Sequence, residues 1–295
     1  MTADSLPFSL AAAPPDRGRR WISSPLFDSI FFILSPVVVL PLTVLTMTVS
    51  PKFAILFFFL AFPHYASTFA FFFWDEYRPR HRTRWVAFFA GPLIIAAAYL
   101  ACFYFAVPRI VQIILFVWNM WHVGRQSGGI LSLYRHRAGV FDPAQKTATN
   151  GAILGCTFFL AFFNIETHPE FGPALAAVSP ALPNIVKIAL GAIAVACLAR
   201  LGLALQRRIR AGQPLLLSEV GFLVTSIAIF HPFLWMKNSA IATATMLLPH
   251  YVQYLGLVWL LHRRRFKAAE GSASQQALTK VSSKTPLLLL MLFSI

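Results

Sequence analysis

Long apolar runs alternate with short polar connections along most of the chain. A helix needs about 20 residues to cross the hydrocarbon core of a membrane, and every run except the fifth reaches that length comfortably. None shows the two-residue alternation that the strands of a membrane barrel require, so each run predicts a helix. The predicted membrane helices cover residues 26–49, 52–74, 85–106, 109–134, 148–165, 183–204, 214–236 and 239–262.

The composition of the chain also indicates a membrane protein. Of the 295 residues, 58% are hydrophobic and only 12% are charged, whereas soluble domains carry about 25% charged residues. We therefore expect an all-α fold, a polytopic integral membrane helical bundle of about eight transmembrane helices. The bundle is predicted over residues 26–265, after a cytoplasmic N-terminal tail at 1–25 and before a polar tail with a short apolar terminus at 266–295.

Lys and Arg residues are unevenly divided between the two sides of the membrane that the predicted helices would cross. With the N-terminus inside, 21 of the 25 Lys and Arg residues fall at the inner ends and connections of the predicted helices. Short cytoplasmic segments of membrane proteins carry such an excess, so both termini are predicted to lie inside a cell membrane, either inner or plasma. The basic residues that orient the protein in the membrane thus account for its net charge of +15. We therefore expect no nucleic acid partner.

Three histidines share one predicted depth. The second, fourth and eighth helices all run from the outer to the inner side. His64, His122 and His250 lie about 12, 13 and 11 residues from the outer ends of these helices. At about 1.5 Å of rise per residue, the three depths agree to within a few ångströms. The three side chains are therefore predicted to meet near the bilayer midplane.

Each of these histidines belongs to a row of polar residues on its helix. Residues three, four, seven or eleven positions apart lie on one side of a helix. Because polar groups in hydrocarbon must find partners, the three rows are expected to face the interior of the bundle. The rows place Thr68 and Asp75 with His64, Asn119 and Gln126 with His122, and Gln253 with His250.

The tripeptide Pro-His-Tyr occurs twice, at Pro63-His64-Tyr65 and at Pro249-His250-Tyr251. A proline inside a helix removes one N–H group and pushes away the carbonyl four residues earlier. The carbonyls of Phe59 and Thr245 should thereby lose their helical partners, which opens each helix beside its histidine. The alternative is coincidence in a chain that contains 20 prolines.

The first functional hypothesis is a metal site. Neutral imidazole is a common ligand of transition metals, and three histidines leave coordination positions open for catalysis. The predicted ion is iron, with copper or zinc as alternatives, bound by His64, His122 and His250. Gln126, Gln253 and Thr68 are the predicted catalytic residues, which complete or orient the ligand set. The expected activity is a metal-dependent oxygenase or oxidoreductase that acts on a lipophilic small molecule or lipid.

Three other hypotheses fit the same residues. Intramembrane His, Arg and Glu side chains also mark the pathways of proton- or ion-coupled transporters and channels, and broken helices mark their central sites. Two histidines could ligate a haem between two helices, which would leave the third histidine unexplained. The histidines could also make interhelical hydrogen bonds without any chemistry.

One intramembrane ion pair is also predicted. Arg125 lies one turn inward of His122 and is costly in hydrocarbon unless it is paired or reaches the interface. Glu219 enters the seventh predicted helix at a comparable depth, so Arg125–Glu219 is the expected structural ion pair; the alternative is that each reaches the inner water layer separately. His231 lies near the outer end of that helix, and with Asp75 and Asn119 it is a possible additional site residue.

Three short patches resemble a known family. Pro63-His64, Trp121-His122-Val123-Gly124 and Pro249-His250 are similar to the histidine motifs of Brp/Blh-type membrane carotenoid dioxygenases. Those multi-helix proteins cleave β-carotene to retinal at a histidine-bound iron. The resemblance implies that His64, His122 and His250 ligate iron and that the substrate is elongated and apolar. It is confined to these three patches.

Overall fold

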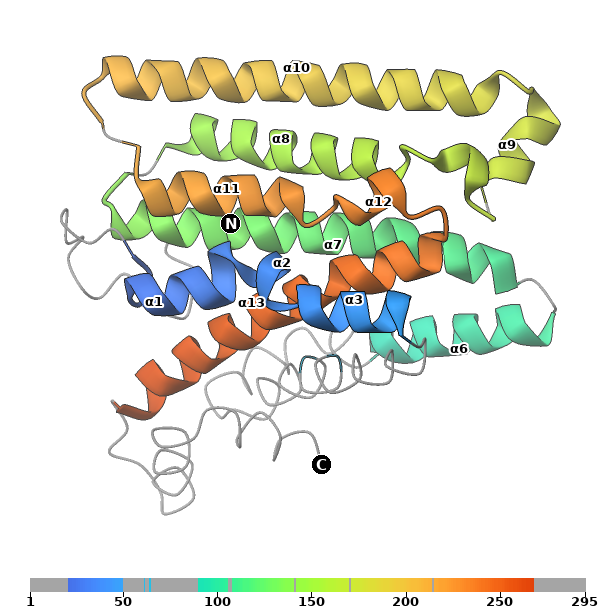
Figure 1. Ribbon diagram of the computed structural model, residues 1–295, viewed down its shortest axis with the longest axis horizontal. Helices are drawn as coiled ribbons and strands as arrows, with labels where there is room; N and C mark the ends of the chain where they lie inside the picture. Colours follow the sequence, from blue (N-terminus) through green and yellow to red (C-terminus); the bar gives the residue numbers. More distant parts are fainter. Residues whose placement is uncertain are drawn as a thin grey trace. The chain divides into compact units, whose positions relative to one another are not determined.

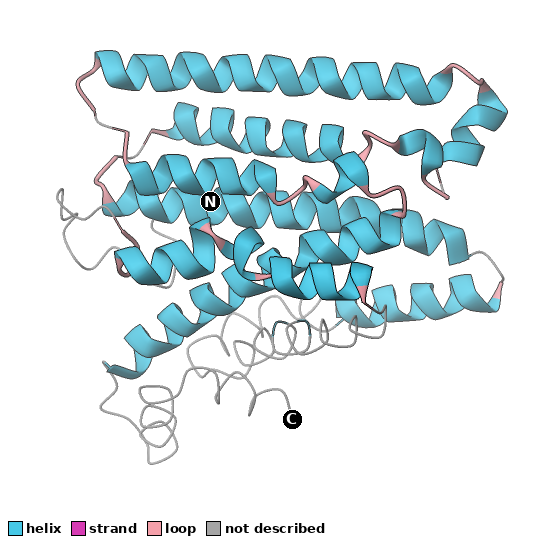
Figure 2. Ribbon diagram, viewed as in Figure 1, coloured by secondary structure: helices cyan, strands magenta, loops and turns pink. Residues whose placement is uncertain are grey.

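The computed structural model of the 295-residue chain is helical wherever it forms regular structure (Figure 2). Its described part contains no strand, as the absence of two-residue alternation predicts. The expected all-α fold class is therefore confirmed for this part of the chain. The structure describes residues 21–49, 61, 64, 90–105, 108–140, 142–169, 171–213 and 215–267.

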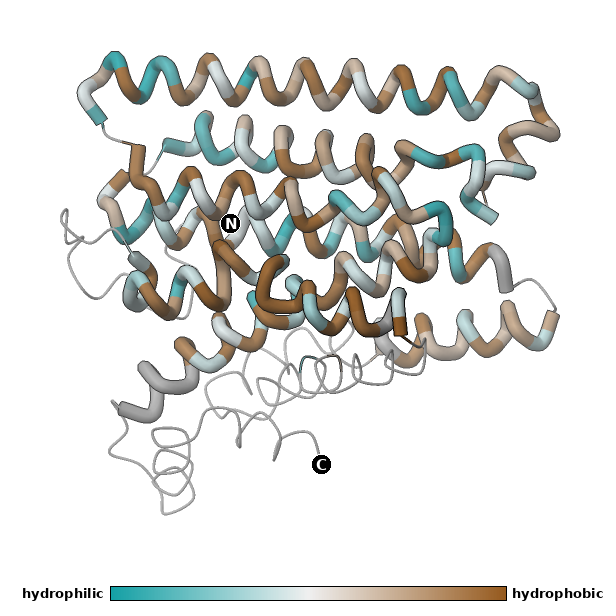
Figure 3. The backbone as a smooth tube through the Cα atoms, in the orientation of Figure 1, coloured by the Kyte–Doolittle hydropathy of each residue, from teal (hydrophilic) through white to brown (hydrophobic). Residues whose placement is uncertain are grey.

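Three helical segments of the described residues are long and apolar enough to cross a membrane. These are α10 (Leu182–Arg210), the segment Leu217–Trp235, and Ser239–Leu261. Apolar residues follow most of α10 (Figure 3), and only 11% of its most apolar stretch is buried within the protein. A helix that is apolar on its exposed side is suited to contact lipid rather than water. These segments support the expectation of a membrane protein.

Most of the predicted apolar runs coincide with observed helices. The later runs correspond to α6 (Gly91–Tyr104), α7 (Pro108–Arg137), α8 (Pro143–Ala161), α10, α11 (Leu217–Ala228) with α12 (Pro232–Trp235), and α13 (Ser239–Lys267). Two short elements, η6 (Ile165–Thr167) and α9 (Gly172–Val178), connect α8 to α10. Of the second predicted run, 52–74, only Ala61 and His64 belong to the described residues, and both are helical.

The first predicted run is helical but interrupted. It contains α1 (Pro25–Asp28), the π-helical turn η2 (Ser29–Ile33), α2 (Ser35–Val38) and α3 (Leu40–Thr48). Pro36 and Pro41 contribute no backbone N–H group, so a regular ladder of helical hydrogen bonds cannot continue through this segment. The result is a succession of short helices instead of the single helix that the hydrophobic pattern predicts.

The chain divides into two compact units, each built from separate stretches of sequence. Within the described residues, unit 1 comprises 21–34, 119–168 and 172–237. Unit 2 contains α2, α3, α6 and α13 together with His64 and the first eleven residues of α7. Helix α7 thus contributes Pro108–Trp118 to unit 2 and Asn119–Arg137 to unit 1.

Glycines bring the helices of unit 1 close together. Gly151 and Gly155 are four residues apart on α8, beside α10 (Figure 1). A Cβ atom on Gly155 would lie only 3.3 Å from the Cα of Ala194 on α10. On α7, Gly124 and Gly128 form a similar pair against Leu154 and Asn150 of α8. Small residues at this spacing let helix backbones approach closely, as membrane helices often do.

An aromatic cluster forms part of the core of unit 1. The rings of Phe32, Tyr134 and Phe222 are fully buried. Their centroids are 6.5 Å apart for Phe32–Tyr134, 6.3 Å for Phe32–Phe222 and 5.8 Å for Tyr134–Phe222. Aromatic rings at such separations add favourable edge-to-face or tilted contacts to the burial of apolar area. The cluster joins η2, α7 and α11.

Candidate functional site

Two of the predicted metal ligands form a buried pair within unit 2. His64 and His250 are 6% and 1% exposed. Their ring centroids are 5.0 Å apart, and the closest pair of potential ligand nitrogens lies within 4.8 Å. The two residues are separated by 186 positions in the sequence, so the tertiary fold has to bring them together. The fold thus brings two of the predicted ligands together, and their binding of a metal stays a prediction.

Two tyrosines of α13 contact His64. The ring centroid of Tyr254 lies 4.3 Å from that of His64, and the centroid of Tyr251 lies 4.8 Å away. Tyr251 also lies 5.7 Å from the ring of His250. Residues 250, 251 and 254 span just over one helical turn, so all three rings of α13 lie close to His64. The imidazole of His64 is therefore held by aromatic contacts from one helix.

Gln253 is anchored on the same helix. Its side chain is fully buried, and Nε2 donates a 3.0 Å hydrogen bond to Oγ of Ser35, which is also fully buried. Gln253 lies three residues after His250, hence about one turn further along the same side of α13. The bond links α2 to α13 and fixes a predicted catalytic residue close to a predicted ligand.

Pro249 does not end its helix. Helix α13 runs from Ser239 to Lys267 with Pro249 inside it. Proline removes one helical hydrogen bond, while the remaining bonds on either side can preserve the helix. His250 therefore sits within a continuous helix. The other proline of the repeated tripeptide, Pro63, lies outside the described residues.

The third predicted ligand, His122, lies on α7 and is half-buried. It belongs to unit 1, four residues beyond Trp118, the last residue of α7 that belongs to unit 2. Asn119 and Gln126, its predicted neighbours on the helix, are also half-buried. Within the described residues the Nε2 of Gln126 is buried and has no hydrogen-bond partner. The predicted polar row of α7 is thus partly covered by protein.

The remaining site predictions have different outcomes. Thr68 and Asp75 lie outside the described residues, so their predicted roles stay predictions. His231 is half-buried, and its Nδ1 is 2.8 Å from the carbonyl oxygen of Ala228. The ring of His231 also lies 6.0 Å from that of Trp235. A local hydrogen bond thus engages one ring nitrogen of His231.

The predicted Arg125–Glu219 ion pair is wrong. Arg125 is exposed, and Glu219 accepts a 2.7 Å hydrogen bond from Nε of Arg135. NH1 of Arg208 also lies 2.8 Å from each carboxylate oxygen of Glu219. Arg135 lies ten residues after Arg125, about 15 Å further along α7. It is therefore in the last turn of α7, beside the first turn of α11, where Glu219 lies.

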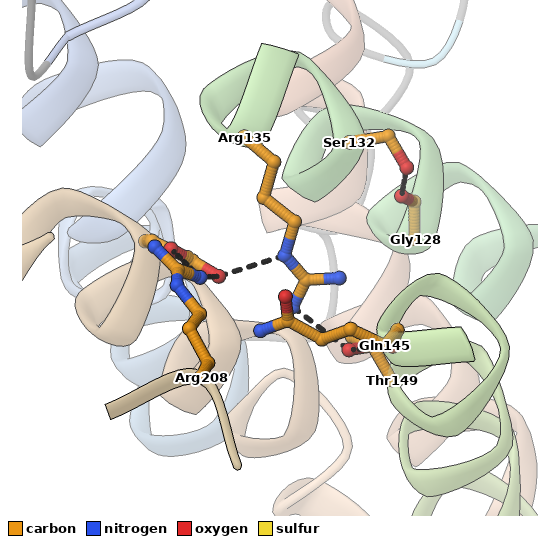
Figure 4. A network of polar contacts seen from close by, with 7 residues as sticks. Gly128, Ser132, Arg135, Gln145, Thr149 and Arg208 are labelled. Atoms are coloured by element: carbon orange, nitrogen blue, oxygen red, sulfur yellow. Dashed lines mark hydrogen bonds and ion pairs between the residues drawn. The ribbon is translucent and has the colours of Figure 1, made fainter. Parts of the chain in front are cut away.

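The acid and the two arginines form a buried cluster in unit 1. Their side chains are 3–4% exposed. NH2 of Arg135 donates to Oγ1 of Thr149 at 2.8 Å, which connects α8 to the cluster (Figure 4). Glu219 lies in the first turn of α11, and both arginines lie in the last turns of their helices. The helix dipoles favour a charge of the observed sign at each of these ends.

Arg135 lies on the buried face of α7, which the structure reveals and the hydropathy of the sequence does not mark. Val123, Ser127, Leu131 and Arg135 are spaced four residues apart on α7, and all are buried. The periodic buried face of the helix thus continues to the arginine. The distribution of positive charge alone predicts that Arg135 and Arg208 are solvent-exposed residues on the inner side of the membrane.

No family model, curated protein or solved structure matches the chain. The resemblance to Brp/Blh-type dioxygenases therefore stays a prediction carried by three short patches. Any proposal about function rests on the chemistry of the residues described above.

Proposed function

We propose that the protein is an integral membrane metal-dependent oxygenase or oxidoreductase that acts on a lipophilic substrate. In this proposal His64, His122 and His250 bind one metal ion, most naturally iron, with copper or zinc as alternatives. A histidine-bound iron with open coordination positions supplies oxygen-dependent oxidation or cleavage. The substrate is a lipid or a small apolar molecule that enters from the bilayer.

The approach of His64 to His250 carries this proposal. Ligand nitrogens about 2.1 Å from a shared ion lie at most about 4.2 Å apart. The limit of 4.8 Å on the nearest nitrogens of this pair is only slightly larger, and a small rotation of either ring closes the difference. A buried pair of imidazoles whose nitrogens can both reach one ion suits a shared metal ion.

His122 is the proposed third ligand. Helix α7 continues from unit 2 without a break, so His122 lies about one turn, or 6 Å of rise, beyond Trp118. The shared depth that the sequence predicts for the three histidines favours the same assignment. Ligands from three different helices would leave part of the coordination sphere open, as catalytic metal sites require.

The surrounding residues have defined tasks in this proposal. Tyr251 and Tyr254 hold the imidazole of His64 and limit the access of water to it. Gln253, tied to Ser35, orients the ligand set or a bound substrate. Gln126 and Thr68 are proposed to do the same from their own helices. None of these residues needs to titrate for these roles.

We also propose a topology of about eight membrane helices with both termini cytoplasmic. It rests on the uneven distribution of Lys and Arg. The connection that contains Glu166 and His168 would then face the outer side. Single cysteines introduced at Thr167, in a variant lacking the three native cysteines, should react with an impermeant maleimide in intact cells. Reaction only after lysis would contradict the topology.

Elemental analysis of the detergent-purified protein tests the function. We expect about one equivalent of iron or copper per chain, and a large loss in each of His64→Ala, His122→Ala and His250→Ala. His136→Ala is the control, because His136 is an exposed histidine in the last turn of α7 and is not among the proposed site residues; it should retain the metal. Retention in all three variants, or a stable metal-free wild type, would contradict the metal site.

A proton- or ion-coupled transporter is the second candidate. The observation that favours it is the buried cluster of Arg135, Arg208 and Glu219, because buried ionisable groups in membrane helices often mark ion pathways. A transporter would use the histidines to carry protons and would not retain a stoichiometric transition metal through purification. Proton uptake by metal-free protein in vesicles, abolished by His250→Ala, would favour this candidate over the enzyme.

A further inference from the structure

Beside the buried cluster lies a polar side chain that none of the proposed functions uses. Gln145 is in the first turn of α8 and is 1% exposed. Within the described part of the chain, neither its Nε2 nor its Oε1 has a hydrogen-bond partner. A buried amide without partners is unfavourable, because it loses its hydration without compensation. The local fold does not explain why this position carries a glutamine.

The position of Gln145 links it to the two arginines. Gln145 and Thr149 are four residues apart, so they share one face of α8. Thr149 on this face accepts the hydrogen bond of Arg135 and donates 2.8 Å to the backbone oxygen of Gln145. Figure 4 shows the Gln145 side chain directed toward the guanidinium of Arg135. The unused amide is therefore part of the surroundings of the ionic cluster.

The charge of the cluster selects the kind of ligand. Arg135 and Arg208 share the single carboxylate of Glu219, so these three side chains together carry one net positive charge. An amide N–H group beside arginine N–H groups forms an array of donors that suits an oxyanion. The start of α8, where Gln145 lies, also presents the positive end of a helix dipole.

We propose that Arg135, Arg208 and Gln145 form a binding site for a phosphate-like oxyanion. Nε2 of Gln145 and the arginine N–H groups donate to its oxygens, while Glu219 holds the two guanidinium groups in place. The ligand is either free inorganic phosphate or the headgroup phosphate of a phospholipid, because both present the same acceptor oxygens. The site belongs to unit 1 and is independent of the proposed metal.

The test is a phosphate titration of the delipidated, detergent-purified full chain, followed by thermal unfolding. We expect wild type to gain a saturable increase in Tm. Gln145→Met, which keeps the length of the side chain but removes the amide, should bind phosphate at least tenfold more weakly. Gln213→Met is the matched control, because Gln213 is an exposed glutamine of the α10–α11 connection; it should behave as wild type.

Gln145→Glu provides a second readout. Its carboxylate would take the place of the proposed anion next to the arginines. We expect this variant to be at least as stable as wild type in phosphate-free buffer, and to show no response to phosphate. The proposal would be overturned if Gln145→Glu were destabilised and still responded to phosphate as wild type does.

Native mass spectrometry before delipidation distinguishes the two sources. One phospholipid per chain, present in wild type and lost in Gln145→Met, identifies the headgroup as the natural ligand. A phosphate response without such a lipid identifies the free anion. If Gln145→Met matches wild type in both phosphate response and bound lipid, the site does not bind oxyanions.

Discussion

Nε of Arg135 donates a 2.7 Å hydrogen bond to Oε1 of Glu219, between side chains that are 4% and 3% exposed. Arg208 shares the same carboxylate, so helices α7, α10 and α11 meet at one buried acid. A buried ion pair is not automatically stabilising, because both charges lose their hydration. Removing one partner, however, leaves the other charge buried without compensation.

Loss of the acid should therefore be severe. We expect Glu219→Ala to reduce the free energy of unfolding by about 3–5 kcal/mol, because it leaves two buried arginines close together. Arg125→Ala is the control, since Arg125 is exposed and makes no contact with Glu219; its effect should stay within about 0.5 kcal/mol. Thermal unfolding in detergent, followed by tryptophan fluorescence, measures both. Similar losses in the two variants would contradict this account.

The aromatic contact of Tyr254 with His64 should matter through the ring and not through the hydroxyl group. Tyr254→Phe keeps the ring at its 4.3 Å separation and should preserve stability and metal content. Tyr254→Ala removes a contact of about 0.5–1.5 kcal/mol and opens space beside the imidazole, so both quantities should fall. Tyr104→Ala serves as the control, because Tyr104 is 84% exposed.

A metal content that drops equally in Tyr254→Phe and Tyr254→Ala would instead assign a direct role to the phenol. Unchanged metal in both variants, with a loss of stability only in Tyr254→Ala, would make the contact purely structural. Inductively coupled plasma mass spectrometry together with thermal unfolding separates these outcomes.

The contact between α8 and α10 depends on the absence of a side chain at Gly155. A valine there would place Cβ 3.3 Å from the Cα of Ala194, and backbone atoms cannot yield as a side chain can. We expect Gly155→Val to cost about 1–3 kcal/mol through overpacking. Gly202 lies on α10, where no atom lies within 4 Å of an added Cβ. Gly202→Val should therefore be tolerated. Thermal unfolding of the two variants provides the comparison, and equal Tm values would contradict the close packing.

Stability should depend on pH through His168, in the connection between α8 and α9. Burial lowers the pKa of this imidazole from 6.5 to about 4. Between these values the unfolded chain binds a proton that the folded chain does not, so the free energy of unfolding falls as the pH decreases from 6.5 to 4. A pKa difference of this size corresponds to a loss of at most about 3.4 kcal/mol.

The variant His168→Gln should remove this part of the pH dependence, while Thr167→Ala, an exposed neighbour, should retain it. Unfolding temperatures measured between pH 4 and 7.5 test the difference. A wild-type slope that survives in His168→Gln would assign the effect to other groups.

Much of the helical architecture follows from the sequence. Apolar runs of the length that crosses a membrane predict the ends of α7, α8, α10 and α13 to within six residues. Hydrogen bonding within a helix is local, so periodicity and length are enough to locate it. The first run was predicted less well, because Pro36 and Pro41 divide it into short helices. The packing glycines of α7 and α8 also have a readable signal, the spacing of four residues.

The sequence also singled out His64 and His250 as partners, through a common depth in two helices. Depth is one coordinate that residue counting supplies, because the rise of a helix is constant. Rotation about the helix axis and the choice of neighbouring helix are not fixed by counting. For this reason the contacts of Tyr254 with His64 and of Gln253 with Ser35 were not foreseen.

Only the tertiary structure decided which arginine binds Glu219. Arg125 and Arg135 lie on the same helix, and their charge is identical, so composition and hydropathy cannot distinguish them. The choice depends on which turn of α7 faces the start of α11 and the end of α10, and therefore on how three helices pack. The sequence determined where most of the described helices form and predicted a common depth for the histidines, because both follow from local geometry along one chain. The partner of each buried charge was decided by packing between helices, because an ion pair forms only where two side chains reach the same place.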